Sequence, residues 1–457
     1  MLRRFLKFLP FLCAIYLILN INLGFANRLS IVRDTEIESI IVNYVTPVFR
    51  AARLDPDSIQ IFIVKDDSLN AFVMNGQKIF IHSGLLIESE SAEEIIGVIA
   101  HETGHIAGGH LSRRRNALSN FSMSNFLSFA LAGAATIATK RSDVGTALVG
   151  VGQTIGQRSF FSYNRAQESA ADYAAVRFLE KAGISALGLL NFMVRIREQE
   201  SMNSNRENRY TRTHPFSDER ISSLKNYINE AFVSDDYKSK DTISSHARLK
   251  AKITSFLTPP RRTIRFLEAK EKSLAVRYGL AIAYHRLSKY ELSQKIIDNL
   301  IKDFPSDPYF LELKGQFLFE VGRGKEALSF LNKAVGILPD APLLRQLTAR
   351  VQIELNEPKL VNSAIKHLKI ALTKEPGSKT SWQQLAIAYG RLGDQRNSWL
   401  AMAEKELLSG SLNNAMYQAS RAEKSFPTGS KEWLQAKDIL NAVKIKKSKK
   451  KYSKPQN

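Results

Sequence analysis

The spacing of hydrophobic residues predicts a mixed α/β region near the start of the chain. Helical spacing over Asp34–Ala52 predicts a helix, and the apolar run Ile59–Val64 predicts a strand. Ala71–Met74 and Lys78–Ile81 flank Asn75-Gly76, a dipeptide typical of a tight hairpin turn. These elements together predict a small β-sheet or hairpin accompanied by a helix.

Two further helices are expected downstream of the hairpin. One should begin near Ser91, because Ser91 and Glu94 have the spacing of a capping box and an apolar pattern follows them. The other should cover Asn164–Ala182 and end before Gly183. Between them, residues 121–157 contain two apolar runs, each too short to cross a membrane. A pair of packed helices is one interpretation of these runs, and a lid or membrane-touching hairpin is the other.

After Ser255 the pattern changes to paired helices. Pro305 and Pro339 are 34 residues apart, which is the period of a tetratricopeptide repeat. Small residues recur where paired helices must approach closely, at Gly315, Ala327, Ala334, Ala364 and Ala371. At least three such repeats predict an α-solenoid with a concave surface for proteins or peptides. The chain is therefore expected to be mainly α, with an α+β domain followed by the solenoid.

The first residues have the pattern of an export signal. Basic residues precede an apolar run, and small residues that suit cleavage follow it, which predicts a signal peptide over residues 1–26 and a periplasmic protein. An uncleaved anchor is the alternative. Cys13 is the chain's one cysteine and lies in this run, so any metal site must use histidine and carboxylate ligands. The remaining chain is expected to divide into a catalytic domain over 27–254, repeats over 255–443 and a basic tail over 444–457.

The basic tail carries much of the positive charge. The formal net charge of the chain is +21, and seven lysines lie between Lys444 and Lys454 with no acidic residue among them. Such a segment is expected to be disordered and to contact an anionic membrane surface or acidic partners. Nucleic acid is not an expected partner of an exported protein.

A pentapeptide on the second predicted helix carries the strongest chemical signal. His101-Glu102-Thr103-Gly104-His105 is an HExxH motif. Histidines at i and i+4 project from nearly one helix face and can reach one metal ion, whereas Glu102 lies to the side, where it can hold an attacking water. A pair of surface histidines is the alternative, and it leaves Glu102 without a purpose.

A hydrolytic zinc site needs a third protein ligand and an open position. The metzincin pattern would place a histidine at position 111, which is Leu111, and His110 comes one residue early and is expected to be structural or on the surface. A later helix offers Glu168 and Asp172 one turn apart. Glu168 can ligate the metal while Asp172 accepts the second N–H of a liganding imidazole. A solvated acidic face is the alternative for this pair.

Four segments resemble one known family. KIFIHSGLL, IAHETGHIAGGHLSRR, NRAQESAADYAA and TRTHPFSDERI, within residues 34–230, are similar to motifs of the gluzincin proteases that include HtpX and the CAAX-prenyl proteases. The resemblance implies that His101, His105 and Glu168 bind one zinc ion, that Glu102 is the general base, and that Asp172 supports a ligand. It also implies that His214 can move onto the zinc and hold the enzyme inactive.

The resemblance further implies a site for substrate. An edge strand that accepts the substrate as an added strand would be formed by Lys78, Ile79, Phe80, Ile81, His82 and Ser83. An ordinary internal strand is equally consistent with this sequence.

The signal peptide and the repeats place the chain closest to a periplasmic branch of this family. The resemblance implies a zinc-dependent endopeptidase in the quality control and assembly of outer-membrane proteins. Its substrates would be unfolded or stalled β-barrel proteins, and the assembly machinery would be a partner through the repeats. The alternative function is a chaperone or scaffold for the same assembly process, with the protease site largely autoinhibited. The integral-membrane relatives have several spanning helices, which this sequence does not predict after residue 26, so a prenylated substrate is not expected.

Overall fold

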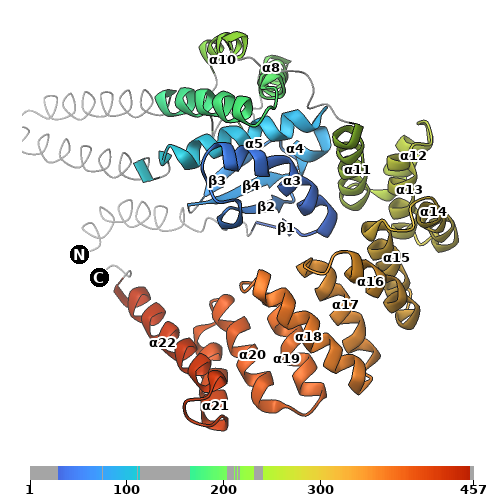
Figure 1. Ribbon diagram of the computed structural model, residues 1–457, viewed down its shortest axis with the longest axis vertical. Helices are drawn as coiled ribbons and strands as arrows, with labels where there is room; N and C mark the ends of the chain where they lie inside the picture. The colour runs from blue at the N-terminus through green and yellow to red at the C-terminus, as the bar shows by residue number, and fades with distance from the viewer. Residues whose placement is uncertain are drawn as a thin grey trace, which may run out of the picture.

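The computed structural model shows an arc of helices with a small sheet at one end (Figure 1). The described residues are 29–74, 76–110, 112–113, 165–202, 210, 214, 217–230 and 240–452. The predicted signal peptide, Asn75 of the hairpin and the apolar runs of residues 121–157 lie outside them. Among the described residues, no helix is both long and apolar enough to span a membrane.

The three predicted strands and one that was not predicted, β1, form a four-stranded sheet with the order β1-β2-β4-β3. The strands are β1 (Ile31–Val32), β2 (Gln60–Val64), β3 (Ala71–Met74) and β4 (Lys78–His82). β4 pairs with β2 in parallel and with β3 antiparallel. Gly76 follows β3 with a φ of +91°, a conformation that glycine adopts without a steric penalty.

The prediction that β4 is an edge strand is wrong. β4 lies inside the sheet, where Phe80 pairs with Phe62 of β2 on one side and Phe72 of β3 on the other. The residues concerned are Lys78, Ile79, Phe80, Ile81 and His82, and Ser83 already belongs to helix α4 (Ser83–Glu88). Strands with apolar residues on both faces are typical of a sheet interior. β3 occupies the edge instead.

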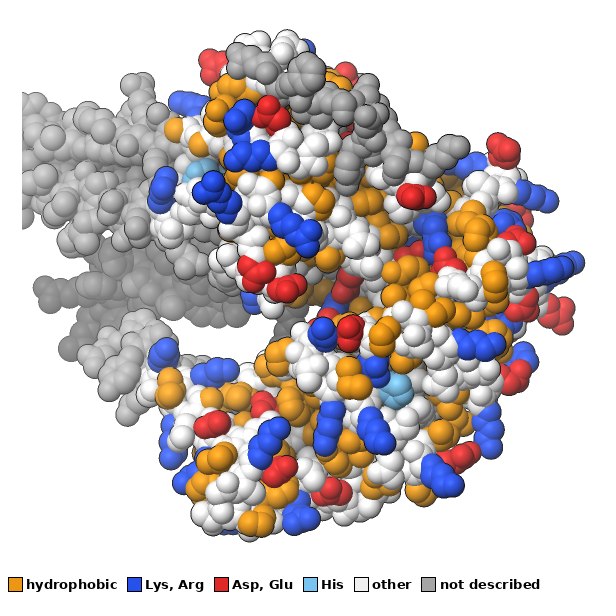
Figure 2. Space-filling view, viewed as in Figure 1, with side chains coloured by type: hydrophobic (Ala, Val, Ile, Leu, Met, Phe, Trp, Pro, Cys, Tyr) orange, Lys and Arg blue, Asp and Glu red, His pale blue; other side chains and the backbone are white. Residues whose placement is uncertain are grey.

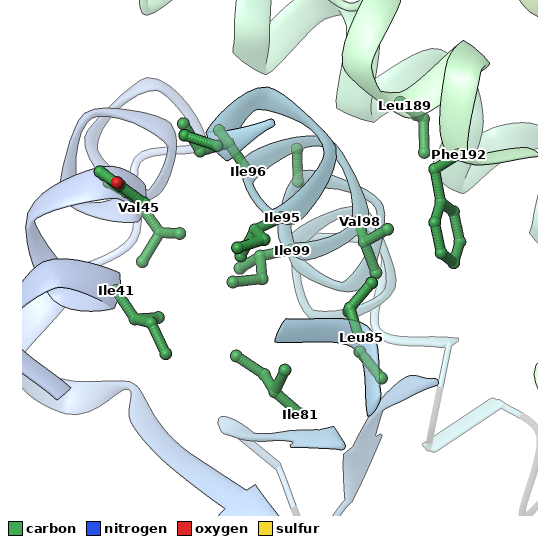
Figure 3. Packing of buried hydrophobic residues seen from close by; sticks show 14 of the residues in the cluster. Ile41, Val45, Ile81, Leu85, Ile95, Ile96, Val98, Ile99, Leu189 and Phe192 are labelled. Carbon is green, nitrogen blue, oxygen red and sulfur yellow. The ribbon is translucent and has the colours of Figure 1, made fainter. Parts of the chain in front are cut away.

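Helices α3 (Thr35–Ala51) and α5 (Ala92–Ala107) cover one face of the sheet (Figure 1). Their apolar faces meet the inward-facing strand residues in one buried cluster, which includes Ile41, Val45, Ile81, Ile95 and Ile99 (Figure 3). On the other side of α5, Leu189 and Phe192 of α8 (Leu187–Met202) complete the packing (Figure 3). The catalytic region is therefore built around α5.

The start of α5 agrees with the sequence in position but not in its capping contacts. Ser91 is the N-cap residue, as predicted, yet its side chain makes no capping hydrogen bond. Glu94 instead accepts from the backbone N–H of Glu90 at 3.1 Å and from Arg195 of α8 at 2.5 Å. The predicted capping box is therefore absent from the start of α5.

Paired helices follow, which confirms the predicted α-solenoid. They are α11 (Lys240–Leu257), α12 (Pro260–Glu268), α13 (Leu274–Arg286), α14 (Tyr290–Asp303), α15 (Pro308–Glu320), α16 (Gly324–Ile337), α17 (Pro342–Leu355), α18 (Pro358–Lys374), α19 (Lys379–Arg391), α20 (Gln395–Leu408), α21 (Leu412–Ser425) and α22 (Lys431–Tyr452). A Cβ at Gly315 would lie 2.6 Å from Leu331 Cγ, so α15 and α16 need a glycine at their contact. On the face shown in Figure 2, basic side chains are scattered over both the catalytic region and the repeats.

The expected disordered tail is helical as far as Tyr452. α22 continues through Lys444 because Ile439 and Val443 are buried against the preceding helices and no glycine or proline interrupts the chain before Pro455. Residues 453–457 lie outside the described part of the chain.

A buried polar network joins the catalytic region to the repeats. Glu36 of α3 is 1% exposed and lies 2.5 Å from Arg248 and 3.2 Å from Lys252, one turn apart on α11. The hydroxyl of Tyr278 on α13 donates to Glu36 at 2.7 Å, and Arg248 also contacts Asp307 at 2.6 Å. α11 thereby fixes the repeats against α3, and the expected domain boundary at 254 falls inside this helix.

Candidate metal centre

The donor side chains predicted from the sequence come from two neighbouring helices. α5 carries His101 and His105, and the helix of residues 165–181 runs alongside it with Glu168 and Asp172 one turn apart (Figure 1). All four side chains are buried, with 0% of His101 and 2% of Glu168 exposed. The alternative that Glu168 and Asp172 form a solvated acidic face is therefore wrong.

The structure brings four possible donors to one point. His101 Nε2 lies 3.1 Å from His105 Nε2 and 3.4 Å from Glu168 Oε2, and His105 Nε2 lies 3.5 Å from Glu168 Oε1. His214 joins them through Nδ1, at 3.3 Å from His101 Nε2 and 3.1 Å from Glu168 Oε2. All four donor atoms lie within 4.8 Å of one another.

The separations among His101, His105 and Glu168 fit three ligands of a tetrahedral metal ion, with each histidine nearest to a different oxygen of Glu168. Zinc binds imidazole nitrogen and carboxylate oxygen at about 2.0–2.2 Å, so the ligand atoms of a tetrahedral site are about 3.3–3.6 Å apart. The distances from His101, His105 and Glu168 to one another range from 3.1 to 3.5 Å. Two imidazoles and one carboxylate are also a donor set of hydrolytic zinc sites.

Glu102 lies beside the donor cluster rather than in it. Its side chain is 1% exposed, and its Oε1 is 3.3 Å from Nε2 of His214. The backbone N–H of Val73 on β3 lies near the Glu102 carboxylate and partly offsets the effect of burial on its pKa. Burial disfavours the ionised form and raises the pKa of Glu102 above its usual 4.5, a direction that makes a carboxylate a better base.

Comparison with known proteins identifies the catalytic region. Residues 32–228 match peptidase family M48, and this range contains all four donors. Residues 32–228 therefore form an M48 peptidase domain. Because the family is one of metallopeptidases and the donor cluster suits a metal ion, the chain is a metalloprotease.

The relatives of the M48 domain include proteins with a similar overall length. A "Beta-barrel assembly-enhancing protease" of Yersinia pestis is 24% identical over 376 residues, 81% of this chain and 76% of the relative. The protein of that name in Escherichia coli K12 is 24% identical over 81% of this chain and 75% of its own length. These alignments are longer than the M48 domain, so the similarity extends into the repeats. "Metalloprotease LoiP" of E. coli K12 is 28% identical over 38% of this chain and 64% of its own.

Solved structures resemble parts of the chain loosely. A crystal structure of MamA is 13% identical, covers 38% of this chain and 97% of its own, and has a TM-score of 0.28. A human IFIT1 dimer structure is 14% identical, covers 94% of this chain and 90% of its own, and has a TM-score of 0.34.

In the M48 domain, Asp172 contacts the ring of His101, and Arg220 contacts Asp172 in turn. Asp172 Oδ1 lies 2.8 Å from His101 Nδ1, while Arg220 contacts Asp172 through Nε at 2.7 Å and Nη2 at 2.9 Å. Arg220, on α10 (Asp218–Glu230), also approaches Glu168 Oε2 at 3.3 Å. Arg220 lies in the segment TRTHPFSDERI, yet the sequence analysis assigned it no role. Its partner Asp172 is far away along the chain, and no local sequence pattern indicates that contact.

The charges around His101 determine its protonation in the metal-free site. Burial disfavours the charged ring, but hydrogen bonds with Asp172 and Glu168 outweigh burial and raise the pKa of His101 to about 10. Burial also opposes the ionised form of Glu168, yet its interactions with the neighbouring His214 and His101 side chains hold its pKa well below 4.5. A metal ion must therefore displace a proton from His101 when it binds.

The contact of His110 with the metal-site residue His105 was not predicted from the sequence. The side chain of His110 is 6% exposed, so it is not on the surface, and its Nδ1 lies 2.9 Å from Nδ1 of His105. α5 ends at Ala107, and Gly109 has a φ of +62°, which turns the chain so that His110 returns to the helix end. If Nε2 of His105 binds a metal ion, its Nδ1–H donates to His110.

Proposed function

We propose that this protein is a zinc-dependent endopeptidase of the periplasm, acting in the quality control and assembly of outer-membrane β-barrel proteins. The observation that carries the catalytic part is the donor cluster of His101, His105 and Glu168 at zinc-compatible distances, with Glu102 beside it. The names of the relatives support the substrate class, and the sequence pattern of residues 1–26 supports export.

In this proposal His101, His105 and Glu168 hold one zinc ion. A bound zinc ion would polarise the scissile carbonyl and lower the pKa of a coordinated water toward about 7. Asp172 accepts the Nδ1–H of His101, and His110 accepts the Nδ1–H of His105, so both rings present Nε2 to the ion. Arg220 keeps Asp172 in place through two hydrogen bonds.

Glu102 is assigned the role of general base. Its carboxylate takes the proton of the attacking water and delivers it to the leaving amine of the cleaved peptide. The contact between Val73 N–H and Glu102 places the edge strand β3 next to this carboxylate. We therefore expect an extended substrate to add to β3, which brings one of its peptide bonds to Glu102.

His214 is assigned the role of a removable ligand. Its Nδ1 lies close enough to His101 and Glu168 to take the fourth ligand position, and its Nε2 lies 3.3 Å from Glu102. Hydrolysis needs that position for water or substrate. This placement also favours a second candidate function, a chaperone or scaffold for outer-membrane protein assembly whose protease site is largely autoinhibited.

The repeats and α22 would supply the contacts with partners. We expect the solenoid to bind unfolded or stalled β-barrel proteins and the assembly machinery, and the lysines from Lys444 onward to touch an anionic membrane. In this scheme residues 27–254 form the catalytic domain and residues 255–443 the repeats, with α11 shared between them.

Zinc analysis and casein cleavage by protein lacking residues 1–26 test the proposal. We expect about one zinc per chain, cleavage by the wild type, faster cleavage by His214→Ala, and loss of cleavage with retained zinc in Glu102→Gln. Cleavage by neither wild type nor His214→Ala, with binding of unfolded barrel proteins intact, would favour the scaffold. Near-normal cleavage by Glu102→Gln would contradict the role of Glu102.

A further inference from the structure

Three phenylalanines form a continuous row across the sheet, on the face opposite α3 and α5. Phe62 of β2 and Phe80 of β4 stack with ring centroids 5.0 Å apart and planes 17° apart. Phe80 and Phe72 of β3 stack with centroids 5.2 Å apart and planes 10° apart. All three side chains are half-buried, whereas Ile79 and Ile81, which flank Phe80, are fully buried in the core. The row therefore forms an aromatic surface on the outer face of the sheet.

The row ends at the strand beside the proposed general base. The carbonyl of Asn70 accepts from His82 N–H at 2.9 Å, so alternate residues from Asn70 onward, including Phe72, direct their backbone groups toward β4. Ala71 and Val73 direct theirs to the opposite edge, where the Val73 N–H lies near Glu102. A chain added to this edge would pair with Ala71 and Val73 and would place one residue directly opposite Phe72.

We propose that this substrate residue extends the row by one ring, so that Phe72 selects an aromatic or large aliphatic side chain close to the scissile bond. The inference rests on the proposed peptidase function. In an antiparallel added strand, the residue opposite Phe72 belongs to a pair without hydrogen bonds between its members, with Cα atoms only about 4.5 Å apart. Side chains in such a pair are close enough to stack, and aromatic pairs are the most favourable of the cross-strand pairs.

The same geometry disfavours other residues at this position. An acidic side chain would lose water and meet the electron-rich faces of the rings, and glycine would offer no side chain to cover the outer edge of Phe72. Strands of membrane β-barrels alternate apolar with polar residues and carry aromatic residues near both membrane interfaces. A row of rings that receives one apolar side chain of an extended segment suits that pattern. The subsite therefore gives the proposed client class a physical basis.

A peptide in which one phenylalanine is moved along a threonine–serine host tests the proposal. Cleavage sites are located by mass spectrometry, with zinc content checked for every variant. For the wild type, we expect the cut to stay at a fixed distance from the phenylalanine and so to move with it. In the Phe72→Ala variant, the position of the cut should no longer follow the phenylalanine. Its kcat/KM for the phenylalanine peptides should fall about 3–10-fold, with little change for the host peptide. Phe62→Ala, at the far end of the row, is the matched control, and its cut should still follow the phenylalanine.

Binding separates this inference from the proposed function. In a Glu102→Gln background, fluorescence anisotropy should show tighter binding of a phenylalanine peptide than of its glycine or aspartate counterpart, and Phe72→Ala should abolish the difference. Equal affinities, or cuts that ignore the phenylalanine, would overturn the subsite and leave the peptidase intact. If phenylalanine peptides bind more tightly but no protein with an intact active site cleaves them, the subsite is supported and the peptidase function is overturned.

Discussion

Gly104 of α5 lies against Ala171 of the helix of residues 165–181, so closely that a Cβ at Gly104 would be 2.8 Å from the Ala171 carbonyl oxygen. The contact involves backbone, which cannot move aside as the end of a flexible side chain can. It lies one residue from His105 along α5. The distance between the two helices, and hence the distance from His101 and His105 to Glu168, depends on this glycine.

Gly104→Ala should therefore separate the two helices and weaken metal binding as well as stability. We expect a loss of about 1–3 kcal/mol in the free energy of unfolding, the usual range for overpacking, together with a lower affinity for zinc. Thermal unfolding and competition with a zinc chelator measure the two effects. Gly336→Ala on α16 is the control, because a Cβ there meets nothing within 4 Å, and it should be neutral or slightly stabilising. Unchanged zinc affinity in Gly104→Ala would show that the helix spacing is not critical.

Arg220→Ala should weaken zinc binding about 10–100-fold, because Asp172 then loses the contacts that hold it on His101. It should also cost about 3–5 kcal/mol in the free energy of unfolding, since Asp172 would remain buried without its partner. Arg220→Lys restores one charge but not the paired hydrogen bonds, so only a partial recovery is expected. Chelator competition and urea unfolding give the measurements. Full recovery with lysine would mean that charge alone matters.

His110→Ala should reduce zinc affinity by about 10–100-fold, because His105 Nδ1 loses the group that accepts its proton. His110→Gln supplies an amide oxygen and should recover part of the loss. His367→Ala, on α18 in the repeats, is the control and should keep the wild-type affinity. If the alanine and glutamine variants at position 110 behave alike, the contact is only one of packing.

Glu312→Gln should stabilise the protein at pH 8 and leave it unchanged near pH 4. Burial raises the pKa of Glu312 from 4.5 to about 7, so the folded chain binds this proton more tightly than the unfolded chain does. The stability linked to Glu312 is therefore fully present below pH 4.5 and is lost as the pH rises through 7. We expect a gain of about 1–3 kcal/mol at pH 8, because glutamine stays neutral and can still accept from Thr35. Urea unfolding at both pH values checks this, and Glu354→Gln, on an exposed position of α17, should show no such dependence.

The features that depend on local periodicity could be predicted from the sequence. The helical spacing of His101 and His105, and that of Glu168 and Asp172, follows from residues one turn apart and does not depend on the rest of the fold. The strand order could not be predicted, because β4 pairs with β2, from which β3 separates it along the chain, and no local pattern indicates that pairing. Arg220 and His110 were missed for a similar reason. The first reaches its partners across a helix contact, and the second is returned to α5 by the left-handed turn at Gly109.

The buried position of Glu36 limits how this chain can be cut or recombined. The match to the peptidase family ends at residue 228, yet α11 starts at Lys240 and contributes Leu249 and Ile253 to the core beneath α3 and α5. A protein fragment that ends at residue 228 would have a cavity in that core. It would also leave the buried carboxylate of Glu36 without Arg248 and Lys252. Protease and repeats are therefore not interchangeable modules. A chimera that borrows repeats from another protein must keep the native sequence of this chain at least to Asp307, where the salt link from Arg248 ends.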